Sequence, residues 1–205
     1  SPMREVLNQQ MDRIRGSQAL AELGLDKDRY ILVSAHREEN IDQEDHFQSL
    51  MNALNQIAEK YRLPTIYSTH PRSWKTIEER GFRFHPLIRQ LKPFGFLDYN
   101  CLQMNAFCVL SDSGTLSEES AILGFPGVLI RTSTERPEVL DKGTIVIGGI
   151  AADDIVQAVD LSRAMRADGA KTAMPADYED DCVSTKVVKI IQSYTKIVNQ
   201  YIWCK

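Results

Sequence analysis

The sequence lacks several features that would point directly to a function. No apolar run reaches the roughly 18 residues that cross a bilayer, and no signal peptide opens the chain. Lys and Arg number 24 against 28 Asp and Glu, so the formal net charge is −4 and no basic field attracts nucleic acid or an anionic membrane. We therefore expect a cytoplasmic protein whose partner is a small molecule, with no nucleic acid and no membrane among its partners.

Metal-binding and redox motifs are also missing. The four cysteines form no CxxC pair, and Cys101 and Cys108 fall in apolar segments where a thiol acts as a small hydrophobe. We expect all four cysteines to be reduced and structural. The four histidines lack the spacing of metal ligands, and neither a Walker loop nor a GxGxxG motif occurs. The sequence thus predicts no metal and no cofactor.

Short apolar runs alternate with helical patterns along the 205 residues. Continuous apolar runs, in place of alternating ones, are typical of parallel strands that are covered on both faces. The pattern predicts one doubly wound α/β domain. Strands are expected at residues 30–35, 65–69, 87–91, 106–110, 127–130 and 144–147. Helices are expected at residues 3–14, 45–61, 73–80, 96–105, 116–123, 137–141, 153–167 and 183–203.

Polar residues follow four of the six predicted strands. Ligands of doubly wound sheets bind outside the carboxyl ends of the strands, so these residues are candidates for a binding site. They are His36 with Arg37 in the polar loop 36–40, His70, the stretch Asp112-Ser113-Gly114, and residues 132–136.

The stretch SDSGTLSEES, residues 111–120, joins a predicted strand to a predicted helix. A helix N-terminus has unpaired N–H groups and a partial positive charge. Gly114 would let a ligand approach this backbone, and Ser113 and Thr115 would add hydroxyl donors, so the turn could hold a phosphate. The same residues also fit an ordinary helix start, in which Thr115 and Glu118 form a capping box.

The adjacent carboxylates Glu118 and Glu119 cannot both serve one site. Neighbouring residues on a helix point about 100° apart. One carboxylate, a turn beyond a phosphate, could accept hydrogen bonds from ribose hydroxyls while the other caps the helix. The alternative for the pair is a solvated helix face that the helix dipole favours.

The remaining candidates also have ordinary explanations. His36 could bind a diphosphate or move a proton, and Arg37 could neutralise the charge of the diphosphate. Alternatively, both side chains are simply solvated. Arg136 precedes Pro137, which suits the first position of a helix, and would lie near a pocket or in a surface loop. Tyr99 could cover a base ring or pack in the core.

Three motifs, taken in order, resemble the non-hydrolysing UDP-N-acetylglucosamine 2-epimerases. They are His36-Arg-Glu-Glu-Asn40, Ser111-Asp-Ser-Gly-Thr-Leu-Ser-Glu-Glu119, and Thr134-Glu-Arg-Pro-Glu138 followed by Gly143-Thr144. Order and spacing fit, and the resemblance runs over nearly the whole chain. It implies that residues 1–205 are the Rossmann-like, UDP-binding second domain of a glycosyltransferase-B-like fold whose first domain is absent.

The resemblance also implies a reaction at C2 of a UDP-sugar. The family removes the C2 proton, expels UDP to form a 2-acetamidoglycal, and adds UDP back on the opposite face. The family's main catalytic carboxylates lie in the first domain, so we expect the chain alone to bind UDP weakly without turnover. The full-length protein is expected to be a homodimer.

Site roles follow from the resemblance residue by residue. Ser113, Gly114 and Thr115 would bind the phosphates, and Glu119 the ribose. A second group would lie near the nucleotide or the sugar. By the resemblance, Arg136 and His36 reach the phosphates or the sugar, and Tyr99 lies near the nucleotide. Arg37 and His70 are added for their place after strands, with His70 as a second-site candidate. His36 would also assist catalysis.

The motifs depart from the common family pattern at two positions. Thr115 replaces the second glycine of Asp-Ser-Gly-Gly, and Glu38 replaces the second arginine of His-Arg-Arg-Glu-Asn. With the longer tail after residue 177, these features resemble the capsule and O-antigen branch, which makes UDP-N-acetyl-L-fucosamine from the L-talo epimer. Interconversion of UDP-N-acetylglucosamine and UDP-N-acetylmannosamine, a UDP-sugar glycosyltransferase, and a non-catalytic nucleotide-binding module are the alternatives.

Overall fold

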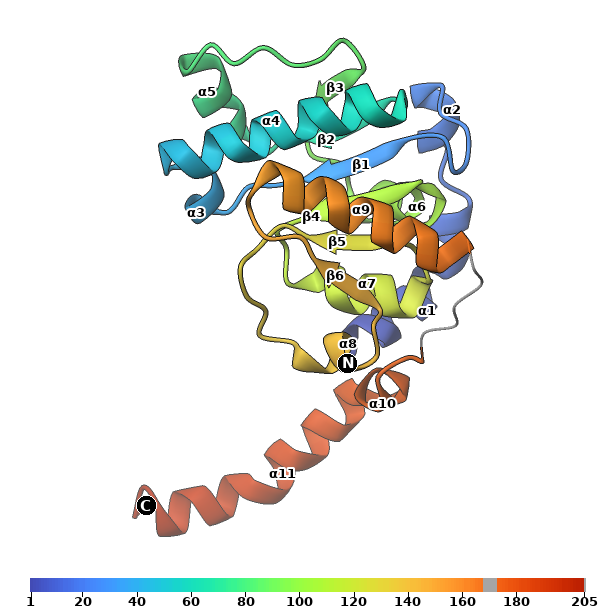
Figure 1. Cartoon of the computed structure of the whole chain (residues 1–205). Helices are drawn as coiled ribbons and strands as arrows, with labels where there is room; N and C mark the ends of the chain where they lie inside the picture. Colours follow the sequence, from blue (N-terminus) through green and yellow to red (C-terminus); the bar gives the residue numbers. More distant parts are fainter. Residues whose placement is uncertain (168–172, 205) are drawn as a thin grey trace.

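Six strands form one parallel sheet in the order β3-β2-β1-β4-β5-β6 within residues 1–167 and 173–204, which the computed structural model describes (Figure 1). Every neighbouring pair runs parallel, which confirms the predicted doubly wound α/β sheet. The strands are β1 (Ile31–Ser34), β2 (Thr65–Ser68), β3 (Ile88–Leu91), β4 (Cys108–Ser111), β5 (Gly127–Leu129) and β6 (Ile145–Ile147).

Helices cover both faces of the sheet (Figure 1). Alternate strand residues point to opposite faces, so Ile31 and Val33 join one core cluster while Leu32 joins the other. The first face is covered by α4 (Glu44–Tyr61) and α9 (Ala152–Ala167). The second face is covered by α2 (Ala19–Leu23), α6 (Phe96–Asn105) and α7 (Thr115–Leu123), and α1 (Pro2–Arg15) packs on the outside of α6 and α7.

Helix α4 illustrates how the sequence pattern produces these layers. Phe47, Leu50, Met51, Leu54 and Ile57 recur at helical spacing and are all buried, as the predicted helix 45–61 requires. Burying a side chain of this size stabilises the fold by about 1.5–3 kcal/mol. The predicted bounds of the other long helices also agree with the structure to within two residues.

Three short helices were not predicted from the sequence. They are α2, α3 (Glu38–Ile41) and α10 (Ala176–Glu179). The prediction that residues 36–40 form only a polar loop is therefore wrong, because α3 begins inside that segment. Helices of four or five residues show too little of the 3.6-residue period to stand out from a loop.

The cysteines divide into two pairs. Cys101 and Cys108 are buried and free, as expected for small hydrophobes. Cys182 and Cys204 are also free, but they are exposed, so the prediction that all four are structural is wrong for these two. Cys182 and Cys204 lie just outside the two ends of the helix at residues 183–201. None of that helix's residues is buried, so the domain does not cover these two thiols.

That helix, α11 (Val183–Tyr201), extends away from the sheet in Figure 1. None of its residues is buried, although its sequence is strongly amphipathic. Its exposed apolar side chains are Val187, Val188, Ile190, Ile191, Tyr194, Ile197 and Tyr201. In the part of the chain that the structure describes, no helix is both long enough and apolar enough to span a bilayer.

Two further short helices frame the polar edge of the sheet. Helix α5 (Pro71–Glu79) begins at the carboxyl end of β2, and α8 (Pro137–Asp141) follows the loop after β5. Pro137 occupies the first turn of α8, as predicted. His70 and Arg136 are the N-cap residues of these two helices, so both candidate side chains are placed at helix starts.

Candidate functional site

The strand order reverses between β1 and β4. From β1 the chain adds β2 and β3 on one side, and then returns to place β4 on the other. In open α/β sheets this reversal leaves a crevice at the carboxyl ends of the two strands. Ser34 and Ser111 form the last registered pair of β1 and β4, so the loops that begin at Ala35 and Asp112 start side by side.

Asp112 ties these two loops together. Its Oδ2 accepts hydrogen bonds from the backbone N–H groups of His36 and Arg37, each at 2.8 Å, and from Asn40 Nδ2 at 3.1 Å. Asn40 Nδ2 also donates to the carbonyl of Ile130, beyond β5, at 3.2 Å. Asp112 and Asn40 are fully buried, so the ends of three neighbouring strands are fixed by one buried polar network.

The start of α7 has no side-chain cap from its N-cap residue, Gly114. Beside it, Ser113 Oγ accepts a long hydrogen bond of 3.4 Å from the N–H of Thr115. The Ser113 and Thr115 hydroxyls lie 2.9 Å apart beside this turn. A Cβ added at Gly114 would meet nothing within 4 Å, so the space over the turn is open. These groups together suit an anion such as a phosphate.

The capping-box alternative for this turn is wrong. Glu118 bonds elsewhere: its Oε1 accepts from Ser1 Oγ at 2.8 Å and lies 3.2 Å from Arg136 Nη1. The solvated-face alternative is also wrong, because Glu118 and Glu119 are both buried. The structure therefore brings Arg136, from the loop after β5, against the first turns of α7.

Glu119 points toward α6, away from Glu118. Its Oε2 accepts a hydrogen bond from Gln103 Nε2 at 2.8 Å. Burial raises the pKa of Glu119, and the charge of Glu118 adds to this rise, while hydrogen bonds from Gln103 and Thr115 lower it. Burying a carboxylate lowers the stability of the folded protein, and a carboxylate with a raised pKa is typical of functional sites.

This raised pKa makes the stability of the protein depend on pH. The folded state binds the Glu119 proton more tightly than the unfolded chain, so the free energy of unfolding falls as pH rises from below the ordinary Glu pKa through the raised one. Glu119→Gln keeps the acceptor for Gln103 and cannot ionise, so it should lose less stability over that range. Urea unfolding from about pH 4 to about pH 8 measures this, with exposed Glu22→Gln as control. Equal pH dependence in Glu119→Gln and the unaltered protein would contradict it.

Tyr99 lies between the core and the site. Its ring packs against the core cluster under α6, as the core-packing alternative predicts. Burial raises the pKa of Tyr99 and the charge of Glu119 adds to it, while hydrogen bonding with Ser34 and Ser111 lowers it. Ser34 and Ser111 are the last residues of β1 and β4.

A groove of about 420 Å³ separates the β1 loop from the start of α5. His36 and His70 face each other across it, with ring centroids 6.1 Å apart. Glu38, the departure from the family pattern, forms an ion pair with Arg72, which also pairs with Asp42 at 2.6 Å. The structure thus brings His70 beside His36, and Glu38 holds the β1 loop against α5.

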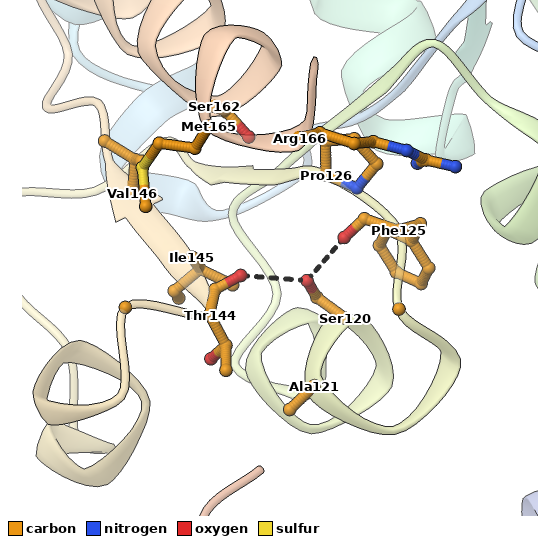
Figure 2. Close-up of a pocket in the computed structure, with 12 residues that line it drawn as sticks. Ser120, Ala121, Phe125, Pro126, Thr144, Ile145, Val146, Ser162, Met165 and Arg166 are labelled. Carbon is orange, nitrogen blue, oxygen red and sulfur yellow. Dashed lines mark hydrogen bonds between the residues drawn. The ribbon is translucent and has the colours of Figure 1, made fainter. Parts of the chain in front are cut away.

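A second, more enclosed cavity of about 270 Å³ lies at the opposite edge of the sheet, before β5 and β6 (Figure 2). Figure 2 shows Ser120 Oγ between the carbonyls of Phe125 and Thr144, at 2.8 and 3.3 Å. Ser113, Gly114 and His36 do not line it. Ligands of this fold class bind at the carboxyl ends of the strands, so we do not assign the nucleotide to this cavity.

Two buried serines of α7, Ser120 and Ser117, allow a paired test of what a buried hydrogen bond contributes to stability. Ser120→Ala removes both hydrogen bonds and should lower the free energy of unfolding by about 1–2 kcal/mol. Ser117 Oγ is equally buried and has no partner in the described part of the chain, so Ser117→Ala should change stability by about 0.5 kcal/mol or less, or increase it. Urea unfolding of both variants measures the difference. Equal losses would show that the Ser120 hydrogen bonds contribute nothing.

Sequence reasoning placed Asp112 and Asn40 at strand ends but missed that their side chains join the loops. Both lie inside quoted motifs, but the pairing of their side chains across 72 residues depends on the strand order. Among the described residues, no three His, Cys, Asp or Glu side chains gather closely enough to hold a metal ion.

The fold and the site define a class of protein: a Rossmann-like α/β domain whose uncapped helix start and polar strand ends meet at the point where the strand order reverses. The chain belongs to the UDP-N-acetylglucosamine 2-epimerase family, whose model matches residues 1–192.

Individual relatives agree with this assignment. The chain is 35% identical over 137 residues to the UDP-N-acetylglucosamine 2-epimerase of Methanococcus maripaludis, covering 65% of this chain and 37% of that protein. It is similar to the solved structure of the Rickettsia bellii enzyme, with a TM-score of 0.87, 36% identity, and coverage of 100% of this chain and 55% of that one. The Methanocaldococcus jannaschii enzyme, solved with UDP-GlcNAc and UDP, gives a TM-score of 0.82 and 25% identity over 93% of this chain and 52% of that one. The chain thus spans about half the length of these relatives or less.

Proposed function

We propose that this chain is the nucleotide-binding half of a two-domain UDP-sugar 2-epimerase. The observation that carries the proposal is the junction of the His36 loop with the uncapped start of α7, held by Asp112 at the point where the strand order reverses. Membership of the epimerase family and the UDP complex of the Methanocaldococcus jannaschii relative support it.

The proposed site residues are arranged around the diphosphate of the ligand. The N–H groups of Gly114 and Thr115, with the Ser113 hydroxyl, would bind the phosphate nearest α7. Arg136 would neutralise the diphosphate, because its guanidinium already lies at the first turns of α7. A second set of residues surrounds the rest of the ligand: Glu119 at the ribose, Tyr99 near the nucleotide, and His36, Arg37 and His70 at the sugar side of the groove.

The domain organisation is part of the same proposal. The relatives are about twice as long as this chain, and α11 carries a row of exposed apolar side chains that the domain itself does not cover. A partner domain of the same protein would cover this row. The complete enzyme is proposed to be a homodimer, since the family resemblance implies one.

The narrower substrate proposal is UDP-2-acetamido-2,6-dideoxy-L-talose, epimerised to UDP-N-acetyl-L-fucosamine. Thr115 and Glu38 support it, because both alter the chemistry next to the sugar and its diphosphate. Thr115 adds a hydroxyl beside Ser113, and Glu38 neutralises Arg72 at the groove. UDP-N-acetylglucosamine is the alternative substrate of the same site.

Titration of the chain with UDP in a calorimeter tests the proposed function. We expect weak, saturable 1:1 binding and no release of an epimerised sugar from a UDP-sugar. Absence of UDP binding would contradict the nucleotide role, and steady epimerisation by the chain alone would contradict the two-domain proposal. In the complete enzyme, NMR in D₂O should show deuterium entering C2 of the substrate, which a glycosyltransferase would not cause.

A further inference from the structure

One oxygen of the buried Asp112 carboxylate has no hydrogen-bond partner among the described residues. Its Oδ2 already accepts three hydrogen bonds from N–H donors, whereas Oδ1 has no hydrogen-bond partner in the described residues. Oδ1 lies 3.5 Å from Nδ1 of His36. An acceptor that is fully buried and unpaired is costly, so its neighbour should be a donor.

The groups around this carboxylate agree with an acceptor role. Two backbone N–H groups and the Asn40 amide donate to Oδ2, and N–H groups can only donate. Oδ1 is therefore an acceptor oxygen that remains for His36.

We propose that Asp112 is a positioning residue that fixes the neutral His36 ring in the tautomer with hydrogen on Nδ1. The other ring nitrogen, Nε2, then carries the lone pair and is the one available to the groove. The gap of 3.5 Å is a loose contact, of the kind that tightens when a ligand binds. The catalytic meaning rests on the proposed function: His36 would act toward the sugar nucleotide as a proton acceptor, oriented by Asp112.

The other three histidines provide internal references. His70 and His85 each accept a backbone N–H bond at Nδ1, from Arg72 and Leu87, so both should carry hydrogen on Nε2. His46 Nδ1 lies 2.8 Å from the carbonyl of Glu39, which can only accept, so His46 should carry hydrogen on Nδ1. The chain is thus expected to contain both tautomers, at positions that serve as references.

Long-range ¹H–¹⁵N correlation spectra of the ¹⁵N-labelled chain, at a pH where imidazole is neutral, read the tautomer of each ring. We expect His36 and His46 to show hydrogen on Nδ1, and His70 and His85 on Nε2. A His36 ring with hydrogen on Nε2 overturns the proposal, whatever the chain binds. Failure of UDP to bind would instead contradict the proposed function and leave this measurement intact.

Asp112→Asn tests the cause. The amide oxygen can still accept from the loop N–H groups, but the amide nitrogen presents hydrogen to His36 Nδ1, which must then accept. We expect His36 alone to change to the Nε2–H tautomer, with the signals of His46, His70 and His85 unchanged. His36 keeping hydrogen on Nδ1 in a folded variant would show that Asp112 does not set the tautomer. If the variant does not fold, the tautomer of the unaltered protein decides the proposal.

Discussion

Arg136→Ala is expected to weaken UDP binding by about 10- to 100-fold and to leave uridine binding unchanged. A hydrogen bond between charged groups contributes about 1.5–3 kcal/mol, and each 1.4 kcal/mol is a factor of ten in affinity. Arg136 lies at the first turns of α7, where the proposed diphosphate would bind. Calorimetric titration with UDP and with uridine measures both affinities.

Comparing UDP with uridine distinguishes the loss of a contact between Arg136 and the phosphates from a disturbed fold. Uridine has no phosphate, so loss of Arg136 should not affect it. Arg13→Ala is the matched control, because Arg13 is exposed on α1 and bonds only to Gln10 among the described residues. Equal losses for UDP and uridine would indicate a disturbed fold, and no loss for UDP would exclude Arg136 from the site.

Asp112→Ala is expected to lower the free energy of unfolding by about 3 kcal/mol. The change removes the acceptor of the His36 and Arg37 N–H groups and one of the two acceptors of the buried Asn40 amide, which keeps the carbonyl of Ile130. Each buried donor that loses its partner costs about 1–3 kcal/mol, and the two backbone groups near the surface can recover part of this from water.

Urea unfolding of Asp112→Ala measures this loss. The control is Asp141→Ala, because Asp141 is exposed at the end of α8 and its removal should change stability by about 0.5 kcal/mol or less. A loss from Asp112→Ala no larger than that of the control would contradict the idea that Asp112 holds the strand ends together.

The sheet was predictable because each strand is a short apolar run. Residues 30–35 and 106–110 are uniformly apolar or small, and runs of this length are typical of strands covered on both faces. The strand order, which places β1 beside β4, was not stated in advance, because it depends on contacts between segments more than 70 residues apart. The four-residue helix α3 was missed because it spans barely one turn, which is too short for a repeating apolar pattern.

The site was predictable only in part. Sequence reasoning brought His36, Gly114 and Arg136 to one edge of the sheet, since all three follow strands. The residue pattern alone could not separate Glu118, which pairs with Arg136, from Glu119, which bonds to Gln103, and only the family resemblance gave the ribose to Glu119. Asp112 was missed as the residue that joins the loops, since its partners lie 72 to 76 positions away.

Whether the crevice between β1 and β4 holds the diphosphate is the central question. Titration of the ¹⁵N-labelled chain with UDP, followed through its backbone amide signals, locates the ligand directly. We predict the largest shifts at Ser113, Gly114 and Thr115, with smaller ones at Arg37. Shifts gathered at the opposite edge of the sheet, around Ser120 and Arg166, or no shifts at saturating UDP, would contradict the account.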